Sequence, residues 1–157
     1  MDLYFSKDNA DLPRPVCLKA TELRKLGFDN LREYLQDPGN VHICRRGRIF
    51  IGSGGSKTVF TYGQSPWANP YKVGDKPGSY TLEESLRRYY DHLDALLTDA
   101  NHLAEFRKLL SAKSIGCFCP LDQPCHRVIL LLRLRAEAEI DKQTESKAKR
   151  AKIETEK

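Results

Sequence analysis

The sequence lacks any long hydrophobic run: apolar residues nowhere approach the ~20 consecutive positions that a bilayer-spanning helix needs. Its start, Met1–Asp8, also lacks the basic-then-apolar order of a secretory signal peptide. These two absences predict an intracellular protein, cytoplasmic or nuclear, that has no membrane partner.

The cysteine content does not suit a disulfide framework either. There are five cysteines, an odd number, and three of them crowd into residues 117–125. That spacing is too tight for ordinary disulfide pairing, so we expect free thiols or a bound metal in a reducing compartment.

Length and charge set broad limits. A chain of 157 residues is expected to form one domain plus tails, and it can bury a core without help from a metal. The net charge of +5 permits a phosphate-bearing partner such as a nucleotide or nucleic acid but does not require one. Nothing in the composition indicates the oligomeric state.

The pattern along the chain predicts an α/β fold: a small single domain with a few-stranded sheet flanked by helices. Residues 1–20 are expected to be an N-terminal arm, 21–140 the domain, and 141–157 a disordered, basic tail without apolar periodicity. Helices are predicted at 22–26, 30–35, 82–97, 100–111 and 124–139, and strands at 41–44, 48–51, 58–62 and 114–119. The first two strands are expected to form a hairpin, and Thr81 with Glu84 predicts a capping box.

The densest group of chemically active side chains is Cys117, Cys119, Cys125 and His126. Alternate residues of a strand share a face, so Cys117 and Cys119 are expected to point the same way. Asp122 is the expected N-cap of the following helix, which would place Cys125 and His126 in its first turn, where an anion or a thiolate is favoured.

Three interpretations of this group remain open. Three thiolates and one imidazole can hold zinc; a reactive thiol or anion-binding pocket is the second possibility; inert, buried cysteines are the third. A zinc deaminase is excluded because no second cysteine follows Cys125 at the required spacing.

Two further segments are candidate binding elements. The loop 65–70 contains Trp67, which can stack on a base or fill the core, and Asn69, which can read a polar ligand edge or form an Asx-turn. Arg45 lies in a cluster of arginines that can contact phosphate. The glycine-rich segment 52–58 fails the register of a phosphate-binding P-loop because no glycine immediately precedes Lys57.

The segments 41–45, 65–70 and 116–126 together resemble the domain-of-unknown-function 4326 family over about residues 23–135. Two residues depart from that family's pattern: Cys44 replaces a usual glycine, and Arg127 follows Cys-His where glycine is frequent. The Cys-His-Arg sequence is also similar to domain-of-unknown-function 488 proteins. Neither family supplies an established activity. The resemblance implies a small α/β domain in which six residues face one another: Arg45, Trp67, Asn69, Cys119, Cys125 and His126.

Our leading hypothesis from the sequence is a pocket for a nucleotide or nucleic-acid group, with possible hydrolase or transferase activity. Arg45 would neutralise phosphate, Trp67 would stack and Asn69 would read a polar edge, and Cys119 is a fourth expected ligand-binding residue. In an enzyme, Cys125 would be the thiolate and His126 the general acid/base. The alternative is a non-catalytic interaction module whose zinc ligands are Cys117, Cys119, Cys125 and His126.

Overall fold

The fold is built on a three-stranded parallel sheet whose central strand is the last one in the sequence. The computed structural model describes residues 11–52 and 54–156. Within them the sheet has the order β1–β5–β2, formed by β1 (Arg14–Cys17), β5 (Ser114–Cys117) and β2 (Asn40–His42). Both outer strands run parallel to β5, so their carboxyl ends meet at one edge. The predicted α/β class is confirmed.

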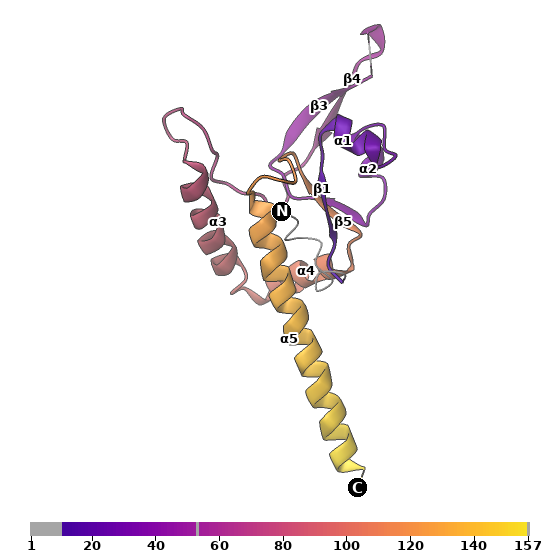
Figure 1. The fold of residues 1–157 in the computed structure, drawn as a ribbon, viewed down its shortest axis with the longest axis vertical. Helices are drawn as coiled ribbons and strands as arrows, with labels where there is room; N and C mark the ends of the chain where they lie inside the picture. Colours follow the sequence, from indigo (N-terminus) through magenta and orange to yellow (C-terminus); the bar gives the residue numbers. More distant parts are fainter. Residues whose placement is uncertain (1–10, 53, 157) are drawn as a thin grey trace.

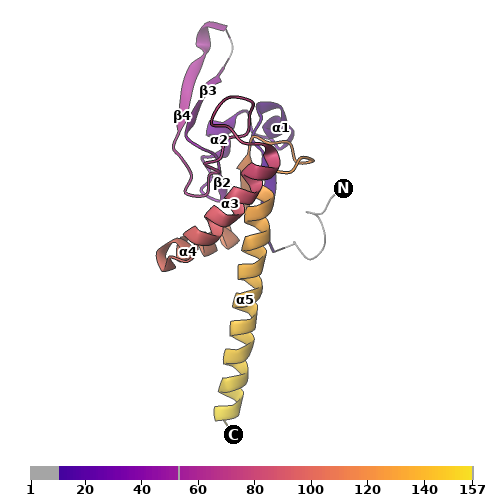
Figure 2. The same ribbon diagram turned by 90° about the vertical axis from the view of Figure 1, so that its left-hand side faces the viewer.

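Helices cover both faces of this sheet (Figures 1 and 2). One face packs against α3 (Leu82–Leu96), α4 (Ala100–Arg107) and α5 (His126–Thr155), and the other faces α1 (Ala20–Lys25) and α2 (Leu31–Tyr34). A short 3₁₀ turn, Lys108–Ser111, follows α4.

The central strand β5 is buried along its whole length, as expected for a strand covered on both faces. Ile115 and Cys117 join the core beneath α3, α4 and α5. Gly116 faces the other side, where a Cβ would overlap the buried side chain of Leu18. The alternation of β5 therefore delivers Cys117 to the α5 side of the sheet.

A separate antiparallel hairpin projects from the body at the end opposite the C-terminus (Figure 1). It consists of β3 (Gly47–Ile51) and β4 (Thr58–Tyr62), joined through a 3₁₀ turn at Gly54–Ser56. The hairpin predicted over 41–51 is therefore wrong, although its strands exist. The first strand pairs with β5 at the edge of the sheet, where Val41 packs against the core beneath α3, α4 and α5, and the second pairs with β4.

Both predicted termini also need correction. Residues 1–10 of the expected arm lie outside the described residues, but Arg14–Cys17 is the edge strand β1, so the sheet begins before residue 21. The tail expected to be disordered from 141 instead continues α5 through Thr155, exposed along almost all of that length. Strong helix formers extend a helix whose first half is already held by packing.

Local sequence signals correctly predicted where α3 begins. Thr81 accepts from the backbone N–H of Glu84, and the Glu84 side chain accepts from the backbone N–H of Thr81, which is the predicted capping box. Among the described residues, no helix has both the length and the apolar character that crossing a membrane requires.

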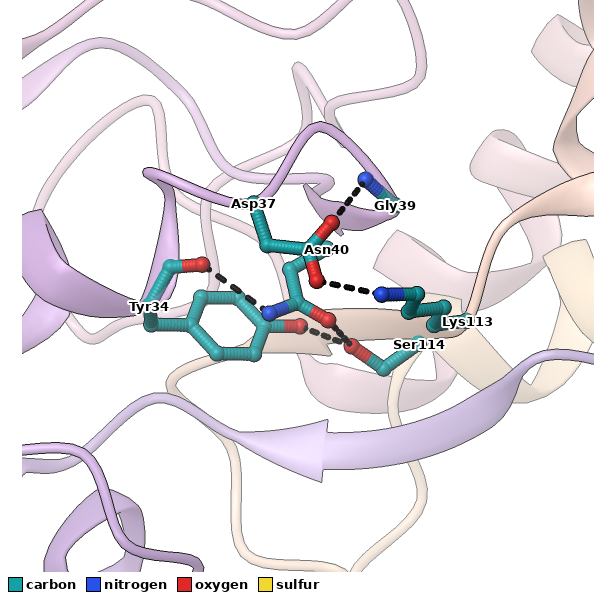
Figure 3. Close-up of polar contacts among 6 residues, drawn as sticks. All are labelled: Tyr34, Asp37, Gly39, Asn40, Lys113 and Ser114. Carbon is teal, nitrogen blue, oxygen red and sulfur yellow. Dashed lines mark hydrogen bonds and ion pairs between the residues drawn. The ribbon is translucent and has the colours of Figure 1, made fainter.

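A buried polar network fastens the loop after α2 to the start of β5 (Figure 3). The Tyr34 hydroxyl lies 2.5 Å from Ser114 Oγ, which donates to Asn40 Oδ1 at 2.8 Å, and Asn40 Nδ2 donates to the Tyr34 carbonyl at 3.0 Å. Lys113 closes the network at the surface by pairing with Asp37 at 2.6 Å. Burial raises the pKa of Tyr34. This network sets the register of β2 against β5.

Replacing Tyr34 by Phe is expected to lower the free energy of unfolding by about 1 kcal/mol, because one buried hydrogen bond is lost while Ser114 keeps Asn40 as acceptor. Urea denaturation checks this. The matched control is Tyr90→Phe, since Tyr90 is 61% exposed. Equal effects of the two substitutions would contradict a structural role for the network.

Candidate functional site

The predicted cysteine cluster lies at the carboxyl edge of the parallel sheet, where ligands bind in open α/β sheets. Cys117 is the last residue of β5, and Ile43–Arg45 directly follows β2. Cys125 is the N-cap of α5, the position that the sequence had suggested for Asp122. Two strand ends and one helix start therefore converge on the same point.

The three sulfurs of Cys117, Cys119 and Cys125 all lie within 4.8 Å of one another. Cys117 Sγ and Cys125 Sγ are 3.2 Å apart. Cys117 and Cys125 are buried and Cys119 is half-buried; all three are free thiols. The structure thus brings together the three cysteines that the sequence grouped.

Arg127 is the residue of this site that sequence reasoning missed. Its side chain is only 1% exposed, and its Nη1 lies 2.9 Å from Cys117 Sγ. The guanidinium also donates to three backbone carbonyls at 3.4–3.5 Å, that of Val16 in β1 and those of Cys119 and Pro120 in the loop after β5. Among the described residues it forms no ion pair with a carboxylate.

A buried cation without a carboxylate partner requires negative charge nearby, and the sulfurs are the groups that can supply it. Hydrogen bonds from Cys117 and then from Cys125 hold the pKa of the Cys119 thiol well below its usual range. Hydrogen bonding to Cys119 and then to Cys125, followed by burial, raises the pKa of Cys117. One negative charge shared among the three sulfurs would balance the buried guanidinium of Arg127, which lies beside Cys117.

His126 is held in one tautomer. Its Nε2 lies 2.9 Å from the carbonyl oxygen of Ile43, which can only accept, so Nε2 carries the proton. Burial lowers the pKa of His126, which keeps the ring neutral at neutral pH. Its Nδ1 therefore presents a lone pair, 3.4 Å from Cys125 Sγ.

A cavity of about 280 Å³ opens above the cluster and includes Arg45, Asn69, Cys119, Cys125 and His126 in its wall. Five of the six residues that the family resemblance grouped thus share one cavity. The guanidinium of Arg45 donates to the Asn69 carbonyl at 3.1 Å. The side chain of Asn69 accepts from Tyr71 N–H and donates to Ser85 Oγ, both at 2.9 Å, so it forms the Asx-turn that had been the alternative.

Trp67, the sixth residue, does not line this cavity. It is 5% exposed and packs edge-on against Phe106, with ring centroids 5.2 Å apart. Its carbonyl accepts from the buried Tyr89 hydroxyl at 2.8 Å. Trp67 thus fills the core and fastens the loop that carries Asn69, and we do not include it in the candidate ligand site.

Two other lining residues escaped sequence reasoning. Cys44 contributes a thiol whose pKa burial raises to about 12, so it stays protonated. Lys72 adds a second cation to the wall, from a loop with no recognisable pattern. Arg127, by contrast, had a signal: it lies in phase with Leu130 and Leu134 on the buried face of α5.

The comparisons with known proteins agree with the resemblance seen in the sequence. A family model described as "Domain of unknown function (DUF4326)" matches residues 30–136. The match covers more than half of the chain, so the protein belongs to this family. Searches of curated proteins and of solved structures returned no match.

Replacing Arg127 by Met is expected to lower the free energy of unfolding by about 3–5 kcal/mol, because the charged sulfur cluster is left buried without its counterion. Chemical denaturation measures this. Arg135→Met is the control, since Arg135 lies on the same helix and reaches only a surface pair with Glu139. A loss no larger than that of the control would show that the cluster carries no charge.

Proposed function

We propose that this protein binds one zinc ion through Cys117, Cys119 and Cys125, at the base of the cavity. The sulfurs around a tetrahedral zinc are roughly 3.8 Å apart, given Zn–S bonds of about 2.3 Å. Cys117 Sγ and Cys125 Sγ are 3.2 Å apart and all three sulfurs lie within 4.8 Å of one another, so small side-chain shifts are enough to form the site.

The observation that carries this proposal is the buried Arg127 beside Cys117. Zinc with three thiolates has a net charge of −1, which one guanidinium neutralises. The metal-free cluster with one thiolate and two thiols has the same charge. Zinc binding would therefore release two protons and leave the balance with Arg127 unchanged.

We propose His126 as the fourth ligand, through Nδ1. The hydrogen bond from Nε2 to the Ile43 carbonyl resembles the outer contact that orients zinc-bound histidines. The 3.4 Å separation of Nδ1 from Cys125 Sγ is close to that expected for two ligands of one tetrahedral ion. With four protein ligands the metal would be structural.

Protein purified in metal-free buffers is expected to contain about one zinc per chain, and chelation is expected to lower its melting temperature. Cys119→Ser should lose the metal, because it removes one of the three proposed thiolate ligands. Cys17→Ser is the matched control, since Cys17 is buried but lies outside the cluster.

Elemental analysis and thermal denaturation together decide the question. A metal-free wild-type protein that also fails to bind added zinc would refute the proposal. Zinc retained in full by Cys119→Ser would refute the assigned ligand set.

A second candidate function is binding of a nucleotide or another phosphate-bearing molecule in the cavity. The specific observation is its charge: the cationic side chains in its wall are Arg45 and Lys72, and the wall has no carboxylate. In the metal-free chain, hydrolysis or transfer would use Cys119 as nucleophile rather than Cys125, because Cys125 is only 3% exposed. His126, beside Cys125, would remain the candidate acid/base.

Adenine and guanine nucleotides are expected to bind the full chain at low salt, and Arg45→Ala to weaken binding about tenfold by removing a charged phosphate contact. Titration calorimetry measures the affinity. Arg87→Ala on the exposed side of α3 is the control. Absence of binding at millimolar nucleotide would refute this second function but would not contradict the zinc proposal.

A further inference from the structure

The outward face of the β3–β4 hairpin is exposed, apolar and cationic. Arg48 pairs across the hairpin with Thr61, and Phe50 pairs with Val59. Because alternate strand residues share a face, these four side chains form one surface, here called the outer hairpin face. Phe50 is 69% exposed and Val59 54%.

The opposite face of the hairpin packs against the body of the protein, which leaves the outer face exposed to solvent. Ile49, Phe60 and Tyr62 pack against the core cluster beneath α1 and α2. The hairpin is therefore anchored through one side and presents the other to solvent, as its position beyond the rest of the body shows (Figures 1 and 2).

The charge of this region is one-sided. From Pro38 to Gly74 the sequence contains no aspartate or glutamate but five cations: Arg45, Arg46, Arg48, Lys57 and Lys72. That segment alone accounts for a charge of +5, equal to the net charge of the whole chain. Within the described residues, Arg46, Arg48 and Lys57 take part in no ion pair, so their charge is available to a partner.

We propose that the outer hairpin face binds single-stranded nucleic acid. Phe50 offers an exposed ring on which a base can stack, and Arg48 lies two residues along the same face to meet a phosphate. Arg46 and Lys57 extend the cationic path at the two ends of the hairpin. Bases and phosphates alternate along a single strand, and its unpaired bases are free to stack. The exposed Phe50 ring with cations on either side offers a contact for each.

The proposal is independent of the zinc centre, because none of the cluster residues contributes to this face. The full chain, as purified, is therefore the right material. Fluorescence anisotropy with labelled oligodeoxythymidine and oligouridine of about 20 nucleotides, in about 50 mM salt, measures binding, and a duplex of equal length is the comparison.

Wild-type protein is expected to bind the single strands more tightly than the duplex. Phe50→Ala should weaken binding at least fivefold, about the smaller end of the loss seen when a stacking ring is removed. Arg48→Ala should weaken binding and reduce the slope of log K against log salt by about 1. The control is Tyr90→Ala, which removes an exposed aromatic side chain from α3, away from the hairpin, and should leave binding unchanged.

A second control separates the hairpin from the basic end of α5. The triple change Lys147→Ala, Lys149→Ala and Arg150→Ala removes three exposed cations there and is expected to preserve the effect of Phe50→Ala. Circular dichroism confirms that each variant folds. The proposal is overturned if no single strand binds, if duplex binds as well as single strands, or if the triple change abolishes binding while Phe50→Ala does not.

Discussion

The contact between the buried Arg127 guanidinium and Cys117 Sγ is the constraint on which the functional region depends. A charge in that position is tolerated only if a compensating anion lies beside it. The three cysteines can supply that anion as a shared thiolate or as a metal–thiolate centre. Arg127 also donates to the carbonyl of Val16 near the end of β1 and to that of Cys119 just after β5, so the same side chain links two strand ends to the first turn of α5.

The carboxyl edge of the sheet is therefore both the place where α5 is connected to the strand ends and a candidate functional site. His126 ties α5 to the segment after β2 through the Ile43 carbonyl, and the cavity opens directly above that connection. The outer hairpin face lies elsewhere, supported by the core cluster of α1 and α2. A metal centre and a cationic binding surface can therefore coexist, because they use different residues of one small domain.

Elements with a local cause were predicted well from the sequence. The capping box at Thr81 and the helical spacing after it located α3. The pattern of residues 114–119 located β5, although the strand ends at Cys117 and Cys119 lies two residues beyond it. The hairpin over 41–51 was wrong because strand propensity does not specify a partner. The true partner of the first strand, β5, lies far along the chain, whereas the second strand pairs with the next one, β4. Trp67 was ambiguous for a similar reason: a large ring suits either a ligand or a core.

By itself the sequence determined the α/β class and the grouping of Cys117, Cys119 and Cys125, because these follow from periodicity and close spacing. It also determined the family, through the resemblance of three segments to known members. Only the tertiary structure decided that Arg127 enters the cluster, that Asn69 and Arg45 share its cavity, and that Trp67 does not. Burial and partner choice depend on segments distant in sequence. A charged residue can be recognised as a buried counterion only once the fold shows what surrounds it.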